Sequence, residues 1–297
     1  MIIERKFQDS TELGEGPVWE PISQTIYWVD ILQGLIFYSI TGALPLTLAT
    51  HQPVGCVVPH EDGSLIAALK DGIYRIDRKT KDIKLIAAPP NEIHGTPHRF
   101  NDGKCDKLGR LWVGSTTTNE TISASSLYCL DLNGELKLAL DNITVSNGLG
   151  WSPDNKTFYF IDSPTRRIDA FDYELSSGTI SNRRTVIDTS SQAGLPDGLS
   201  VDSEGMLWVA HWDGYRICRW NPYDGRCLET VELPVARITS CCFVGDELNL
   251  LFVTTARIGQ SSKLLQSQPL AGSTFIITPD CKGLALTPCH AKSTPPP

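Results

Sequence analysis

Six repeated positions of this 297-residue chain, here called the register, include residue types that could hold a metal ion. Each of six positions precedes a tight turn of the glycine type, and four of them have a carboxylate or amide oxygen. The positions are Glu15, Val54, Asp102, Asn147, Asp197 and Ser240. A single Asp-Gly or Asn-Gly pair usually marks only a turn. Glu15, Asn147 and Asp197 together offer three oxygen donors from separate segments, which suits a divalent cation such as Ca²⁺, Mg²⁺ or Mn²⁺.

Polar groups beside this register could contact a substrate. Arg99 and Asn101 stand just ahead of Asp102. An arginine usually lies on the surface or pairs with an acid, but its rigid donor fork also suits substrate oxygens. His211 is a weaker candidate for such a contact. His94 and His98 are separated by Gly95 and Pro97, which break the helix that a metal-binding pair at this spacing needs.

Other catalytic motifs are missing from the sequence. It contains no Gly-x-Ser-x-Gly, no His-Glu-x-x-His, and no phosphate-binding or dinucleotide glycine loop. The polar register therefore has one competing structural explanation, in which these groups only cap strand ends around a water-filled channel.

The elements that would position these residues follow from an internal repeat. Six strand-like runs centre on Tyr27, Leu65, Leu111, Phe158, Leu207 and Leu251, at steps of 38 to 49 residues. This is the length of a four-stranded propeller blade. The sequence therefore predicts an all-β, six-bladed β-propeller with a metal site in its central channel. The register residues should share one height, where the innermost strand of each blade begins, and no convincing helix is expected.

Further expectations concern the ends and the long connections. Residues 1–290 should form a single propeller domain, and residues 291–297 a disordered tail. Residues 2–5 should pair with residues 274–277 and so close the ring. Two irregular stretches, residues 87–99 and 116–126, are candidates for loops that cover a site.

Composition limits the classes of partner. A formal net charge of -8 and a pI near 5.3 argue against nucleic acid and against an anionic membrane surface. No apolar run approaches the roughly 18 residues of a membrane span, and the first residues lack a hydrophobic signal core. We expect a cytoplasmic protein, monomeric or a small homo-oligomer. Its nine scattered cysteines favour free thiols over a disulfide framework.

Four motifs in order resemble the gluconolactonase/regucalcin (senescence marker protein) family of six-bladed propellers. They begin at Leu13-Gly14-Glu15-Gly16-Pro17, Arg99-Phe100-Asn101-Asp102-Gly103, Ser146-Asn147-Gly148-Leu149 and Leu195-Pro196-Asp197-Gly198. The resemblance extends over nearly the whole chain.

The resemblance implies one divalent cation, whether Ca²⁺, Mn²⁺, Mg²⁺, Zn²⁺ or Fe²⁺, bound by Glu15, Asn147 and Asp197. It also implies that Arg99 and Asn101 contact a sugar lactone, the small-molecule partner, which is hydrolysed to its aldonic acid. It does not make Asp102 a ligand, and we interpret that residue as a support or a strand cap. Animal members look acidic where this chain has Thr116-Thr117-Thr118-Asn119, so the resemblance does not fix the preferred substrate. Asn119 is a third candidate for substrate binding.

Three hypotheses follow for function. The leading one is a metal-dependent sugar-lactone hydrolase in which Asp197 both holds the metal and accepts a proton from water. The second is a calcium-binding regulatory protein that uses the same ring without turnover. The third is a propeller scaffold for protein interactions, in which the polar ring is incidental.

Overall fold

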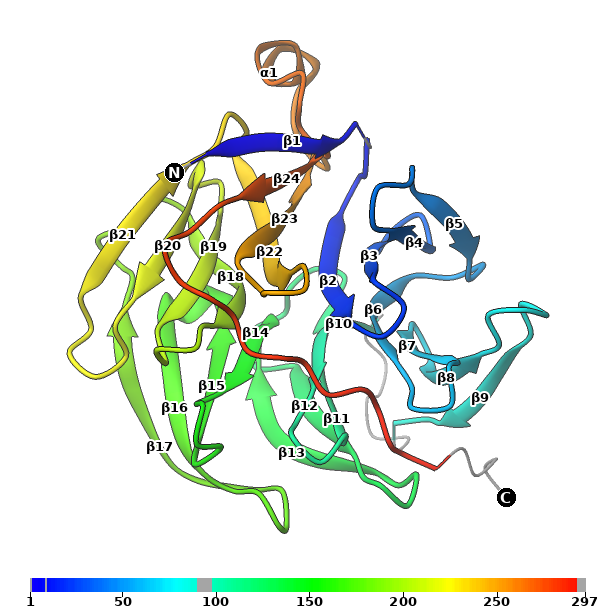
Figure 1. Ribbon diagram of the computed structural model, residues 1–297. Coiled ribbons are helices and arrows are strands. Elements are labelled where there is room, and N and C mark those ends of the chain that lie inside the picture. Colours follow the sequence, from blue (N-terminus) through cyan, green and yellow to red (C-terminus); the bar gives the residue numbers. More distant parts are fainter. Residues whose placement is uncertain (1, 9, 90–97, 293–297) are drawn as a thin grey trace.

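Six four-stranded antiparallel sheets form the body of the protein and surround a central axis (Figure 1). The computed structural model describes residues 2–8, 10–89 and 98–292. The six apolar runs seen in the sequence all lie in the second strand of their sheet, counted from the centre. The all-β, six-bladed propeller expected from the repeat is confirmed.

The first three blades run from the centre outwards in chain order. Their strands are β2 (Gly14–Glu20), β3 (Thr25–Asp30), β4 (Leu35–Ile40) and β5 (Leu46–Ala49); β6 (Val54–Pro59), β7 (Leu65–Leu69), β8 (Gly72–Ile76) and β9 (Ile83–Ala87); and β10 (His98–Cys105), β11 (Leu111–Thr117), β12 (Ser125–Leu130) and β13 (Leu136–Ile143).

The fourth and fifth blades repeat this order, whereas the sixth takes its outermost strand from the other end of the chain. The strands are β14 (Ser146–Trp151), β15 (Thr157–Asp162), β16 (Arg167–Glu174) and β17 (Thr179–Asp188); β18 (Leu195–Val201), β19 (Leu207–Trp212), β20 (Arg216–Trp220) and β21 (Cys227–Glu232); and β22 (Arg237–Val244), β23 (Leu250–Ala256), β24 (Thr274–Ile277) and β1 (Ile3–Phe7).

Pairing of the N-terminal strand with the last strand closes the ring. Strand β1 runs antiparallel to β24, with Ile3 opposite Ile277 and Arg5 opposite Phe275. Phe7 then stacks on Trp28 of the first blade at a ring separation of 5.5 Å. The expected closure is confirmed, and the stacked rings join it to the neighbouring blade.

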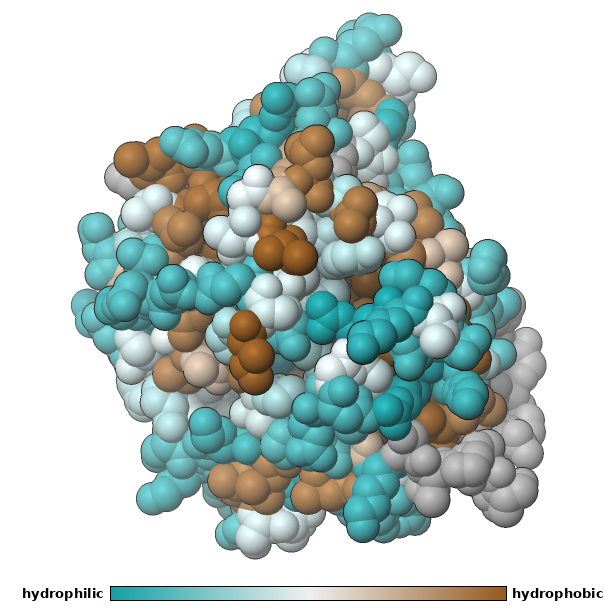
Figure 2. Space-filling model, turned by 45° about the vertical axis from the view of Figure 1, so that its right-hand side comes forward, coloured by the Kyte–Doolittle hydropathy of each residue, from teal (hydrophilic) through white to brown (hydrophobic). Residues whose placement is uncertain are grey.

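The core lies between the blades rather than at the centre of the molecule. Each of the apolar clusters in the described residues combines side chains from two adjacent blades, and together the clusters form a closed cycle. Apolar side chains therefore fill the spaces between sheets, and the polar residues of the innermost strands are left facing the axis. On the surface, Figure 2 shows apolar residues scattered among polar ones.

Two expectations about the chain need correction. A short helix, α1 (Ser262–Ser267), is present, and the Ser261 side chain accepts a hydrogen bond from Leu264 N–H at its start; a single 3-10 turn, η1, covers Ser163–Thr165. Such short turns bury too little to leave an apolar period in the sequence. Ala291 is buried and Lys292 N–H donates to Leu132 O at 3.0 Å, so both pack against the domain and are not part of a tail.

The described residues contain no helix of the length and apolar character that crossing a membrane requires. His94 and most of the 87–99 connection lie outside the described residues.

Candidate functional site

The six register residues lie in the six innermost strands, and a break in strand pairing occurs at every one of them. In β14 the pairing with β15 shifts between Asn147 and Leu149, and in β18 it shifts between Pro196 and Leu199, around Asp197. Corresponding shifts occur in β2, β6, β10 and β22. A β-bulge turns side chains away from the regular alternation of a strand. The repeated bulges are how the sequence presents these residues to the axis.

The glycines after Asn147 and Asp197 allow neighbouring inner strands to approach closely. A Cβ atom on Gly148 would lie 2.6 Å from Asp197 O, and one on Gly198 would lie 2.1 Å from Ser240 Oγ. No side chain fits at such distances. The Asn-Gly and Asp-Gly pairs, which in a sequence usually mark only turns, therefore also have a packing role. They bring the register residue of one blade beside that of the next blade.

A hydrogen-bonded chain joins three of the inner strands at the ring. Asn101 donates to Asn147 Oδ1 at 2.9 Å and to Ser146 O at 2.8 Å. Asn147 in turn donates to Ser163 Oγ at 2.8 Å, and Ser163 donates to Pro196 O at 2.6 Å, one residue before Asp197. The contacts fix the Asn147 amide with its oxygen directed to the Asn101 side.

Arg99 is held at the start of β10 by the same chain of contacts. Its Nη1 atom donates to Asn101 Oδ1 at 2.5 Å and to Phe100 O at 3.1 Å. Burial lowers the pKa of Arg99, and the negative charges of Glu15, Glu120 and Asp197 oppose that shift. Arg99 therefore lies in the electrostatic field of the ring, with its guanidinium oriented by Asn101.

Three carboxylates share the buried part of the ring. Burial and then the charge of Asp102 raise the pKa of Glu15 to about 8, although Gly16 N–H donates to its carboxylate at 2.8 Å. Burial, followed by repulsion from Glu15 and Asp102, raises the pKa of Asp197 well above its ordinary value. Burial raises the pKa of Asp102, which accepts from Gly103 N–H at 2.8 Å within β10. The ring therefore concentrates three buried carboxyl groups whose charged forms repel one another.

The donor set fits a divalent cation held by oxygen atoms. Asp197 is only 5% exposed, and its Oδ1 atom has no hydrogen-bond partner among the described residues. A buried oxygen without a partner lowers the stability of the fold unless a cation or a water molecule binds it. The described residues hold no cluster of three or more His, Cys, Asp or Glu side chains suited to a metal; the expected set combines the two carboxylates Glu15 and Asp197 with the amide of Asn147.

The remaining sequence candidates have different surroundings. Asn119 is exposed, and its side chain accepts from Thr121 Oγ1 at 2.8 Å. His211 is fully buried in β19 beside Ala193 O, and burial lowers its pKa to about 4, which makes it a neutral group of the blade. His98 lies 2.7 Å from Ala124 O. None of these contacts places Asn119, His211 or His98 on the ring.

Sequence reasoning missed two residues that act on the ring. Ser163 orients the Asn147 amide, and the charge of Glu120 reaches both Arg99 and Asp197. Neither belongs to the repeated register. The proline after Ser163 is the one local signal of a turn there, and Glu120 lies within the 116–126 stretch that the sequence marks as a candidate covering loop.

Comparison with known proteins agrees with this architecture. Residues 13–257 match the family described as "SMP-30/Gluconolactonase/LRE-like region". A Danio rerio protein named regucalcin is 38% identical over 281 residues, covering 93% of this chain and 94% of the relative. A Bacillus subtilis protein, provisionally named the sugar lactone lactonase YvrE, is 34% identical over 264 residues and covers 89% and 90%.

A solved structure shows the same fold. The structure of regucalcin from Agrobacterium tumefaciens, described as a calcium-binding protein, has a TM-score of 0.90 and 26% identity, covering 96% of each chain. A single family relationship thus accounts for both the fold predicted from the repeat and the four motifs. The chain belongs to the SMP-30/gluconolactonase/LRE-like family.

Proposed function

We propose that this protein hydrolyses a sugar lactone to the corresponding aldonic acid with the help of one divalent cation. The observation that carries the proposal is the unpartnered, buried Oδ1 atom of Asp197, within the field of Glu15 and Arg99. Membership of a family that includes gluconolactonases supports the reaction class.

The cation would be held by Glu15, Asn147 and Asp197, and its chemistry there is to polarise the lactone carbonyl and to lower the pKa of water. Asp197 accepts the proton of the attacking water as the water oxygen bonds to the carbonyl carbon. The bond from that carbon to the ring oxygen then breaks, and the departing oxygen takes a proton to become a hydroxyl group. No covalent bond to the enzyme is needed.

Arg99 orients the substrate in this mechanism. Both amide hydrogens of Asn101 are already donated to Asn147 and Ser146, so Asn101 acts mainly by holding Arg99 and Asn147 in place. The guanidinium has five N–H donors, and those not used on Asn101 and Phe100 can bind the lactone oxygens. Asn119 and Glu120 lie in the loop that follows β11, where they would meet the sugar hydroxyls.

The identity of the metal and of the lactone is tested by one experiment. Purified protein is stripped of metal, reloaded singly with Ca²⁺, Mg²⁺, Mn²⁺, Zn²⁺ or Fe²⁺, and assayed by pH-stat against a panel of aldonolactones. Turnover that is lost on chelation and restored by metal supports the proposal. Full activity in protein shown by elemental analysis to be metal-free would overturn it.

A calcium-binding role without turnover is the second candidate, because relatives are named regucalcin and one is described as calcium-binding. The same experiment separates the two. Tight Ca²⁺ binding with no hydrolysis of any lactone in the panel would favour the regulatory role.

A further inference from the structure

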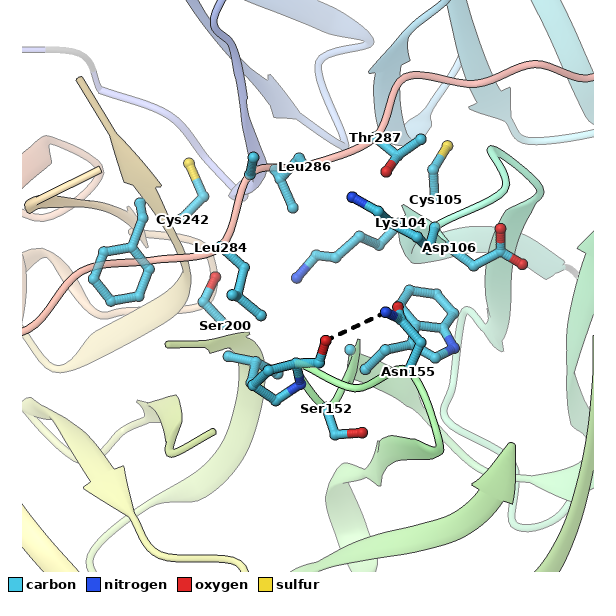
Figure 3. Close-up of a pocket in the computed structure, with 17 residues that line it drawn as sticks. Lys104, Cys105, Asp106, Ser152, Asn155, Ser200, Cys242, Leu284, Leu286 and Thr287 are labelled. Atoms are coloured by element: carbon cyan, nitrogen blue, oxygen red, sulfur yellow. Dashed lines mark hydrogen bonds between the residues drawn. The ribbon is translucent and has the colours of Figure 1, made fainter. Parts of the chain in front are cut away.

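A cavity lies at the opposite end of the central channel from the acidic ring. It has a volume of about 180 Å³ and is bordered by the far ends of the inner strands β10, β14, β18 and β22 (Figure 3). The segment 281–292, here called the C-terminal strap, crosses this end of the channel (Figure 1), and its residues 284–287 form one wall. We call this space the far-mouth cavity.

The far-mouth cavity is separate from the acidic ring. Asn147 is the second residue of β14 and Gly150 lies three residues further on, which is about 10 Å along a strand. A small space of about 10 Å³ is lined both by Asp102 and Ser240 of the ring and by Lys104 and Leu286, which also line the far-mouth cavity. A space of that size holds about one water molecule. A sugar bound at the ring therefore has no described path to the far-mouth cavity.

The polar lining of the far-mouth cavity is positively charged. Lys104 Nζ donates to Leu199 O at 2.8 Å, and an ammonium group has three donors; Figure 3 shows the labelled Lys104 side chain extending into the open space. Lys107 also borders the cavity. The lining carboxylate, Asp106, is already paired with Arg110 at 2.6 Å. Lys104 and Lys107 thus border a cavity whose lining acid is paired, and the charge of Lys104 also acts on Asp102 further along β10.

The rest of the lining combines large apolar side chains with a few polar ones. Trp151, Val201, Phe243, Leu284 and Leu286 supply apolar walls, and Ser152, Asn155 and Thr287 also border the cavity. Ser152 and Asn155 already donate within their own turn, to Asp154 and to Pro153 O. Ser200, which is buried at the rim, already donates to Cys241 O at 2.8 Å. A polyhydroxylated ligand would lose its water here with few polar partners to replace it. A ligand with an anionic head and an apolar body suits both the lysines and the walls.

We propose that the far-mouth cavity binds a small hydrocarbon carboxylate, with the carboxylate on Lys104 and the apolar body between Trp151 and the C-terminal strap. This site goes beyond the proposed hydrolysis and does not depend on it. The ammonium group supplies a charge-assisted hydrogen bond to the head, Lys107 adds favourable charge at the rim, and the apolar body leaves water.

The probe for this site is hexanoate, and hexanamide is its uncharged counterpart. Titration calorimetry on the full-length protein should show saturable binding of hexanoate and at least about ten-fold weaker binding of hexanamide, as expected for loss of a charged hydrogen bond. Lys104→Met keeps the length of the side chain and should weaken hexanoate binding about ten-fold or more. Lys107→Met should weaken it less, and Lys263→Met, on α1 and away from the cavity, should leave it unchanged.

Two further variants keep the test decisive. Ala285→Trp fills the mouth while keeping both lysines, so it should abolish binding even if Lys104→Met fails to fold. Asp197→Asn, with or without chelator, should bind hexanoate as well as the parent, which separates this site from the catalytic proposal. The inference is overturned if hexanoate does not bind at about 10 mM, if hexanamide binds equally well, if folded Lys104→Met or Ala285→Trp binds normally, or if Asp197→Asn loses binding.

Discussion

Replacement of Asp197 by asparagine should stabilise the metal-free protein while it destroys activity. The change keeps the size of the side chain and one oxygen, but it removes the charge and the basicity. Asp197 is buried, its Oδ1 atom lacks a partner among the described residues, and its pKa is raised by burial and by repulsion from Glu15 and Asp102. A neutral side chain at this position relieves that repulsion.

The direction of the stability change follows from the direction of the pKa shift. Each unit by which a carboxyl pKa is raised in the folded state costs about 1.4 kcal/mol of stability once the pH lies above that pKa range. The new amide group has two N–H donors to satisfy, which offsets part of the gain. We expect Asp197→Asn to be more stable than the parent at pH 7 without metal, which a higher Tm would show.

Catalysis should change in the opposite direction. The affinity for the cation should fall because one of two carboxylate ligands is lost. The value of kcat at saturating metal should remain about 10²–10⁴ below the parent, which is the usual contribution of a general base. Lactone hydrolysis by pH-stat over a metal titration, with Tm from calorimetry on the chelated protein, measures both effects.

The matched control is Asn147→Asp, which adds a fourth carboxylate to the ring without removing the base. It should lower the stability of the metal-free protein and disturb metal binding more than proton transfer. If saturating metal returns Asp197→Asn to within a few-fold of the parent, Asp197 is a ligand only. If Asp197→Asn melts lower than the parent without metal, the charge-repulsion argument is wrong.

Four other outcomes are expected. Arg99→Lys should lower kcat/KM although the charge is kept, because the planar fork is lost, and its metal affinity should be unchanged; parental efficiency in Arg99→Lys would contradict the orienting role. Ser163→Ala frees the Asn147 amide and should weaken metal binding, measured by calorimetry, by up to about ten-fold, whereas a Ser177→Ala control in the exposed turn after β16 should not. Deleting residues 1–8 removes β1 and the Phe7–Trp28 stack and should lower Tm markedly; an unchanged Tm would refute the closure. Finally, the His211 pKa of about 4 lies below its usual 6.5, so the unfolded chain binds the extra proton and stability should fall as pH drops from about 6.5 to 4, by up to about 3 kcal/mol; in His211→Gln, denaturant titrations over this range should show a shallower loss.

The fold and the level of the ring along the propeller axis could be predicted because both follow from the repeat length of the sequence. The distance from Tyr27 to Leu65 and its successors is the length of one blade, and equivalent positions in equal units must lie at equal heights. The closure by β1 followed from the same count, since the first residues fall outside a complete blade. These conclusions needed no knowledge of which blades touch.

Residues outside the period could not be placed in this way. Ser163 reaches Asn147 and Pro196 O from a turn between blades, and Glu120 acts on the ring from a loop. Lys104 faces the far end of the channel although it stands two residues after Asp102. The short helix α1 and the packing of Ala291 also left no periodic trace.

The sequence by itself determined the number of blades, the strands that line the axis and the oxygen-bearing residues at one level. Only the tertiary structure decided what each of those residues does. The bulges turn them towards the axis, and the glycines let adjacent blades approach until Asn101, Asn147 and Ser163 share hydrogen bonds. The raised pKa values of Glu15 and Asp197 arise from burial and from charges contributed by other blades. The sequence sets which chemical group each residue carries. The charges around that group come from residues far away in the sequence, and they come together only once the ring has closed.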